Sequence, residues 1–248
     1  MNNQRVAIIT GASSGIGRIT AITLSAAGWK LGLSGRRTEK LEETARECKS
    51  ETIVVPSDVS KEDDVRTLFE KTVERFGRLD MLFNNAGISS RPVNIDELSL
   101  ETFRNVLDVN VVGSFLCARE AMKIFKAQSP PGGRIINNGS LAAHTPRPQA
   151  LSYTTSKHAI TGLTKSIALD GRAFNITCTQ IDIGNALTEM AAGQAKGILQ
   201  PDGSVRPEAT FDVQHVADTV LHIASLPNDV AILTITIMAA KAPYVGRG

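Results

Sequence analysis

Near its start the chain reads Val6-Ala-Ile-Ile-Thr10-Gly11-Ala-Ser-Ser-Gly15-Ile-Gly17. The apolar, β-branched run at residues 6–10 predicts a strand buried on both faces, and residues 18–27 predict a helix. A glycine turn between strand and helix is typical of a dinucleotide fingerprint, where backbone approaches a pyrophosphate at the helix N-terminus. The spacing is G-x-x-x-G-x-G rather than the standard G-x-G-x-x-G, so an ordinary glycine-rich turn is the alternative. The cofactor contacts predicted in this turn are Gly11, Ser13, Ser14, Gly15, Ile16 and Gly17.

A second predicted strand, residues 30–35, runs into Arg36-Arg37. An acidic residue usually follows this strand when the cofactor ribose carries free hydroxyls, whereas arginine accommodates a 2′-phosphate. No Asp or Glu occurs between Leu31 and Thr38, and guanidinium groups offer planar donor forks to a phosphate. The sequence therefore favours NADP(H) over NAD(H), with two solvated loop arginines as the alternative.

The segment from Ser140 to Lys157 carries the candidate chemistry. Tyr153 and Lys157 are four residues apart at the start of a predicted helix, 153–173, so their side chains share one helical face. A lysine ammonium beside a phenol favours the phenolate, and the pair is therefore suited to general acid/base work. Ser140 follows an apolar predicted strand, 133–138, and is placed to hydrogen-bond a substrate oxygen. Without further support, a Tyr-x-x-x-Lys pair on a solvated helix is the ordinary interpretation.

Asn110 is the fourth candidate. It lies in the middle of a long predicted helix that begins at Leu98 or Ser99, although asparagine is a mediocre helix former. A functional role is one explanation, and a solvent-facing asparagine is the other.

Strands and helices alternate along the rest of the chain. The further predicted strands are 52–55, 81–83, 175–181 and 230–238, and the further helices are 39–49, one running from a Ser60/Asp63 capping box to Phe76, and 212–225. This alternation predicts an α/β, Rossmann-type doubly wound sheet of about seven parallel strands flanked by helices, in a single domain spanning 1–248. Residues near 189–211 are small and polar and are predicted to form a lid over the substrate.

Composition narrows the class of protein. The chain has 248 residues, of which 42% are hydrophobic, and a net charge of +2, which does not favour a nucleic-acid partner. Three widely spaced cysteines without a CxxC motif indicate buried free thiols in a reducing compartment, and no Cys/His cluster indicates a metal site. The N-terminus leaves no room for a signal peptide, and no apolar run reaches the ~18 residues of a membrane span. A cytoplasmic protein is therefore expected.

Taken together, these residues resemble the short-chain dehydrogenase/reductase family over nearly the whole chain. The matching motifs are Thr10-Gly11-x-x-x-Gly15-Ile-Gly17, Asp58-Val59, Asn84-Asn-Ala-Gly87, Asn110 before Val111-x-Gly113, Gly139-Ser140 and Tyr153-x-x-x-Lys157.

The resemblance implies a role for each matched residue. Tyr153 would be the general acid in reduction and the base in oxidation, and Lys157 would favour the tyrosinate and bond the nicotinamide ribose. Ser140 would hold the substrate oxygen, and Asn110 would fix a water in a proton relay. The remaining cofactor contacts would be Asp58, Val59, Asn85, Ala86, Gly87, Ala186 and Thr188. Helices 99–126 and 153–173 are apolar all round and would form the interface of a homodimer or homotetramer.

The chain departs from the family pattern at a few positions. Ile183-Gly184 stands where Pro-Gly is common, and the last strand lacks the usual glycine pair. His144 and Arg147, in the loop 141–151, could meet an anionic or polar substrate or could simply be solvated. Sugars, hydroxy acids and acyl thioesters all remain open as substrates.

The leading hypothesis is an NADP(H)-dependent oxidoreductase that interconverts a small-molecule ketone or aldehyde and an alcohol. The alternatives are an NAD(H)-preferring dehydrogenase of the same family, a catalytically idle dinucleotide-binding sensor on this fold, and an epimerase or dehydratase with the same Tyr–Lys pair.

Overall fold

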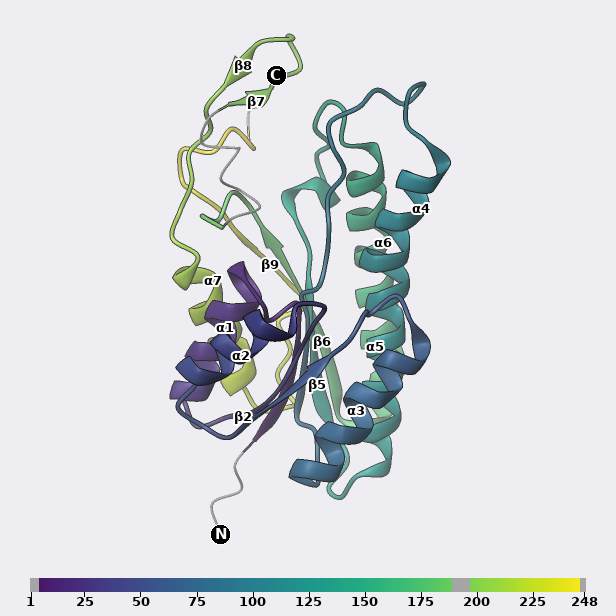
Figure 1. Cartoon of the computed structure of the whole chain (residues 1–248), viewed down its shortest axis with the longest axis vertical. Coiled ribbons are helices and arrows are strands. Elements are labelled where there is room, and N and C mark those ends of the chain that lie inside the picture. The colour runs from purple at the N-terminus through teal and green to yellow at the C-terminus, as the bar shows by residue number, and fades with distance from the viewer. Residues whose placement is uncertain (1–4, 189–196, 246–248) are drawn as a thin grey trace.

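In the computed structural model, residues 5–188 and 197–245 are described. Seven parallel strands form the central sheet in the order β3-β2-β1-β4-β5-β6-β9, with helices on both faces (Figure 1). The strands are β1 Val6–Thr10, β2 Lys30–Gly35, β3 Thr52–Pro56, β4 Met81–Asn84, β5 Gly133–Asn138, β6 Ile176–Ile183 and β9 Thr234–Ile237. The predicted doubly wound, single-domain α/β fold is confirmed.

The helices are divided between the two faces of the sheet. One face carries α1 Gly15–Ala26, α2 Thr38–Glu47 and α7 Gln214–Ser225, and the other carries α3 Glu62–Phe76, α4 Leu100–Leu107, α5 Gly113–Ala127 and α6 Leu151–Gly171 (Figure 1). Each parallel pair of strands needs a crossover, and here these crossovers are helical. As a result, the carboxyl ends of all seven strands lie at one edge of the sheet.

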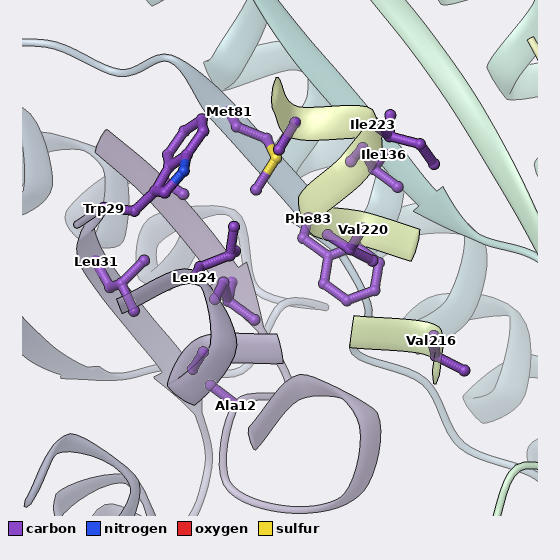
Figure 2. Packing of buried hydrophobic residues seen from close by; sticks show 14 of the residues in the cluster. Ala12, Leu24, Trp29, Leu31, Met81, Phe83, Ile136, Val216, Val220 and Ile223 are labelled. Carbon is purple, nitrogen blue, oxygen red and sulfur yellow. The ribbon is translucent and has the colours of Figure 1, made fainter. Parts of the chain in front are cut away.

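Each face of the sheet has its own hydrophobic core. Figure 2 shows the first, where Leu24 of α1 and Val216 and Val220 of α7 pack on Phe83 and Ile136 of the sheet. The second core joins the opposite sheet face to α3, α5 and α6. Strands buried on both sides are expected to be largely apolar, and in the fully buried Val6–Thr10 only Thr10 is polar.

Strand order reverses between β1 and β4. The chain proceeds outward from β1 to β2 and β3, then returns to place β4 on the other side of β1. Loops that follow β1 and β4 therefore diverge, and ligands of open α/β sheets bind in the crevice outside such a switch point.

Two predicted details of the elements were wrong. Ser60 does not cap α3, because its N–H and hydroxyl both donate to Asp58 Oδ1, and the helix begins at Glu62 with Lys61 as N-cap. The long predicted helix from Leu98 or Ser99 is broken by a π-helical segment, Asp108–Val112, between α4 and α5. The predicted start of this helix agrees with the structure, because the N-cap of α4 is Ser99, whose hydroxyl accepts from the N–H of Thr102.

The predicted lid lies partly outside the described residues, which omit 189–196. Its described part forms a hairpin that the sequence did not predict, with β7 Ile198–Leu199 antiparallel to β8 Val205–Arg206. The strand register is Ile198↔Arg206 and Leu199↔Val205.

The cysteines are free, as expected, but only two of them are buried. Burial raises the pKa of the Cys117 and Cys178 thiols to about 12, whereas Cys48 is half-buried. Among the described residues, no group of His, Cys, Asp and Glu could hold a metal ion, and no helix could span a membrane.

Candidate active site

A cavity of about 790 Å³ opens at the carboxyl edge of the sheet. Its walls come from the segments that follow β1, β2, β3, β4, β5 and β6, and from the hairpin strand β7. The fold therefore brings the motifs that are far apart in the sequence to one place.

The glycine turn after β1 forms one end of this cavity. Gly11 and Gly15 have positive φ angles of 67° and 53°, which favour glycine. A Cβ on Gly17 would lie 2.3 Å from the Gly11 carbonyl oxygen, so only glycine lets α1 approach the turn this closely. Ser14, the N-cap of α1, makes no side-chain capping bond, which leaves the helix N-terminus to a ligand. These features fit the pyrophosphate of a dinucleotide.

The two arginines line the cavity beside this turn. Arg37 Nη2 donates to Ser14 Oγ at 2.8 Å and to Ser13 Oγ at 3.2 Å. Arg36 faces Asp58: burial acts to raise the pKa of that carboxyl, but the Ser60 hydrogen bonds and the charges of Arg36 and Lys61 outweigh it and lower the pKa. The arginines thus place positive charge where the second strand ends.

The end of β4 is tied to the glycine turn by side-chain bonds. The Thr10 hydroxyl accepts the backbone N–H groups of Asn85 and Ala86, at 2.9 and 3.0 Å. Asn85 Nδ2 donates to the Thr10 carbonyl oxygen at 2.9 Å, and Asn85 Oδ1 accepts from Asn138 at 2.9 Å. This network fixes the floor of the cavity.

Tyr153 and Lys157 project from the first turns of α6 into the same cavity. Lys157 Nζ lies 5.5 Å from the centre of the Tyr153 ring. It also donates to the Asn138 carbonyl oxygen at 2.7 Å, and Lys157 is only 7% exposed. A largely buried ammonium beside the phenol is the arrangement that the spacing predicted, and Ser140 lines the same cavity.

Asn110 does not line the cavity but stands behind it. Its Oδ1 accepts from the N–H of Ile88, and its Nδ2 donates to the Ile88 carbonyl oxygen and to Ser156 Oγ, at 2.8, 2.9 and 3.0 Å. Asn110 is 2% exposed, so the solvent-facing alternative is wrong. It lies in the π-helical segment, a feature frequently found at functional sites.

The structure brings the predicted site residues together, with two exceptions. Gly17 and Asn110 lie outside the lining, and the other predicted residues are all part of it. Ala186 and Thr188 reach it from the loop after β6. Ile183, at the position of the usual proline, continues β6 and pairs with Ile237 of β9.

The sequence missed several residues of the cavity wall. Asn138 and Asn185 are polar residues near strand ends, a signal that could have found them, whereas Ile198 and Leu199 belong to the unpredicted hairpin. Arg147, for which the sequence left substrate contact and solvation as alternatives, lines the cavity, and its Nη2 donates to Glu208 Oε2 at 2.7 Å. His144 does not line it.

Comparison with known proteins shows which family has this fold and these motifs. The model of the family described as short chain dehydrogenase matches residues 5–198. A 3beta-hydroxysteroid dehydrogenase of Mediterraneibacter gnavus is 34% identical over 200 residues, which are 78% of this chain and 71% of that protein.

Two solved structures show the same fold. A 3-ketoacyl-(acyl-carrier-protein) reductase from Brucella melitensis, in complex with NADH, has a TM-score of 0.86 and 26% identity, covering 96% of this chain and 98% of that one. An actinorhodin polyketide ketoreductase with NADPH has a TM-score of 0.84 and 25% identity, covering 96% and 97%. These neighbours support a nicotinamide dinucleotide as the cofactor. Because the family model matches well over half of this chain, the chain belongs to the short-chain dehydrogenase/reductase family of oxidoreductases.

Proposed function

We propose that the protein is an NADP(H)-dependent oxidoreductase that interconverts a ketone or aldehyde and an alcohol, with Tyr153 as general acid/base. One observation carries the proposal: a single cavity joins the arginine-flanked glycine turn to Ser140, Tyr153 and Lys157. A dinucleotide on the turn would have its nicotinamide end directed toward these three side chains.

The chain's own residues handle the proton. In reduction, the Tyr153 hydroxyl donates its proton to the carbonyl oxygen, and the Ser140 hydroxyl donates a hydrogen bond to the same atom. The Lys157 ammonium stabilises the phenolate that remains. When bound, the nicotinamide supplies the hydride to the carbonyl carbon, or accepts it in the reverse direction. Asn110 supports this arrangement from behind, by fixing Ile88 and Ser156.

The preference for NADP(H) rests on Arg36 and Arg37. Arg37 is already oriented toward the turn by Ser13 and Ser14, so its guanidinium is in position to contact a 2′-phosphate. The similar solved structures hold NADH in one case and NADPH in the other. The fold thus accepts both, and the residues after β2 make the choice.

Aliphatic side chains also line the cavity, among them Ile88, Leu141, Ile198 and Leu199. Hairpin β7–β8 would cover a substrate there. Intact Ser140, Tyr153 and Lys157 in one cavity favour catalysis over an idle dinucleotide sensor. Further parts of this proposal are a homodimer or homotetramer and, from the free cysteines, a cytoplasmic site of action.

The test is NADPH oxidation with a panel of ketones and aldehydes, followed by absorbance. We expect turnover of at least one carbonyl, and a loss of about 10²- to 10⁴-fold in kcat for Tyr153→Phe, as removal of a general acid costs. Binding of NADPH to Tyr153→Phe should persist, which separates lost chemistry from lost cofactor. Product formation without net oxidation of NADPH would instead support an epimerase or dehydratase.

A further inference from the structure

Asp182 is a buried carboxylate that the roles given so far do not use. It lies on β6 at the sheet edge that carries the cavity, yet its side chain is only 1% exposed. A buried charge is costly unless hydrogen bonds or opposite charge compensate it, so its surroundings should show what it supports.

Both carboxylate oxygens of Asp182 are occupied. Oδ1 accepts from the backbone N–H of Ser140 at 3.0 Å and from Gln180 Nε2 at 2.7 Å. Oδ2 lies 2.7 Å from Nε2 of His144, whose side chain is 42% exposed. Asp182 therefore links β6 to both ends of the segment from Ser140 to His144.

The neighbouring glycine makes this contact possible. A Cβ on Gly139 would lie 2.2 Å from Asp182 Oδ1, so no other residue at this position could let the carboxylate reach the Ser140 N–H without a shift. The short distance shows that the carboxylate and the chain after β5 are fitted to each other.

The Ser140 hydroxyl is oriented by a second bond. Its Oγ accepts from the N–H of Ala142 at 3.1 Å, at the start of the short helix Leu141–Ala143. With an acceptor site of the oxygen occupied in this way, the O–H group is available to donate to a substrate. Asp182 thus fixes the backbone of Ser140, and the N–H of Ala142 fixes its side chain.

Ser140, His144 and Asp182 are the residue types of a hydrolase triad, but their geometry differs from one. In such a triad the histidine takes the proton of the serine hydroxyl. Here Asp182 bonds the backbone of Ser140, and among the described contacts the Ser140 hydroxyl makes none with the His144 ring. A nucleophilic serine is therefore not supported.

We propose that Asp182 is a positioning residue for Ser140, and that His144 completes the support by bonding the second carboxylate oxygen. This inference rests on the proposed function, in which Ser140 holds the substrate oxygen. The His144–Asp182 pair then fixes the catalytic serine to β6. Misplacement of the Ser140 hydroxyl would slow turnover without weakening cofactor binding.

The experiment is a double-mutant cycle on NADPH-driven reduction of a carbonyl that the panel identifies. With Ser140 present, Asp182→Ala should lower kcat about 10- to 100-fold, because small displacements at a reacting centre have effects of this size. In a Ser140→Ala background the same change should cost less than about 3-fold, since no hydroxyl remains to be misplaced. Equal losses in both backgrounds would overturn the inference and leave Asp182 a purely structural role.

Two further variants keep the test decisive if Asp182→Ala does not fold. Asp182→Asn keeps an acceptor for the Ser140 N–H and should stay within about 5-fold of the wild-type kcat. His144→Ala should lower kcat by about 3- to 10-fold, while His222→Ala, which removes an exposed histidine on α7, should have no effect. The affinity for NADPH should be unchanged throughout. Wild-type kcat in His144→Ala together with a loss above 10-fold in Asp182→Asn would contradict the inference.

One readout does not depend on any substrate. The Ser140 amide, followed by NMR hydrogen exchange, should be protected in the wild type and in Asp182→Asn, and faster in His144→Ala. Fast exchange in the wild type would overturn the contact itself. Failure of every carbonyl, or full activity of Ser140→Ala, would instead refute the proposed function or the role of Ser140 in it.

Discussion

At the scale of single residues, the cofactor preference depends on two side chains. Replacing Arg36 with Asp and Arg37 with Ala should weaken NADPH binding about 10- to 150-fold, because a hydrogen bond to a charged group contributes about 1.5–3 kcal/mol. NADH binding should improve or stay constant, since a carboxylate can accept from the ribose hydroxyls. Thermal shift with each cofactor at matched concentrations measures the change.

The control for this pair carries the same change in charge elsewhere. Arg66→Asp with Arg75→Ala alters two exposed arginines of α3 that pair with surface carboxylates. It should leave the ratio of the NADPH and NADH affinities unchanged. An unchanged ratio in the Arg36/Arg37 variant would mean that the 2′-phosphate lies elsewhere.

The sequence reached the side chains that belong to local patterns. Tyr153 and Lys157 were predicted because four residues along one helix bring two side chains together, and Arg36-Arg37 because they follow a recognisable strand. Asp182 and Asn138 were not predicted, since most of their partners lie in segments far away in the sequence, and such contacts depend on how the elements pack together. The sequence alone does not distinguish a buried carboxylate such as Asp182 from an ordinary polar residue.

At the scale of elements, the close packing of α1 against the glycine turn predicts the effect of a substitution at Gly17. Gly17→Ala should lower stability and cofactor affinity, because its Cβ would lie 2.3 Å from the Gly11 carbonyl oxygen and 2.6 Å from Asn85 Nδ2. Overpacking of this kind costs about 1–3 kcal/mol. Denaturant unfolding and NADPH titration measure the two effects.

Gly162→Ala is the matched change in the interior of α6. A Cβ there would meet nothing within 4 Å. The variant should gain about 0.5–1 kcal/mol in the free energy of unfolding, as replacement of glycine by alanine does in a helix. Equal effects of the two changes would mean that α1 can move away from the turn at little cost.

Elements with a strong period were predicted, and those that depend on tertiary contacts were not. Strands β1 and β4 follow from apolar runs between turns. The π-helical segment at Asn110 does not, because what holds it is the bonding of the Asn110 side chain to Ile88, a residue of the loop after β4. Hairpin β7–β8 has strands of two residues each, too short to show a period.

At the scale of the whole molecule, alternating strands and helices were sufficient to predict the sheet. Parallel strands require crossovers, and helices of 8 to 21 residues between strands supply them. The order β3-β2-β1-β4-β5-β6-β9 was not derivable from the pattern alone, because hydrophobic periodicity does not specify which strands are neighbours.

The exposed apolar residues on α5 and α6 make a prediction about assembly. Phe115 is 45% exposed and Leu169 is 62% exposed, on helices that lie side by side over one face of the sheet (Figure 1). A second copy of the chain packed against these two helices would cover both side chains. We expect a dimer or tetramer by light scattering, and a shift to smaller species for Phe115→Glu with Leu169→Glu, because like charges buried at an interface oppose association.

Val205→Glu provides the control for this prediction. Val205 is 67% exposed but lies on the hairpin β8, away from both helices. The change adds a similar charge to a similarly exposed apolar position, so the assembly should persist. A wild-type monomer at all concentrations would contradict the assembly, and dissociation by Val205→Glu alone would move the interface from the helices to the hairpin.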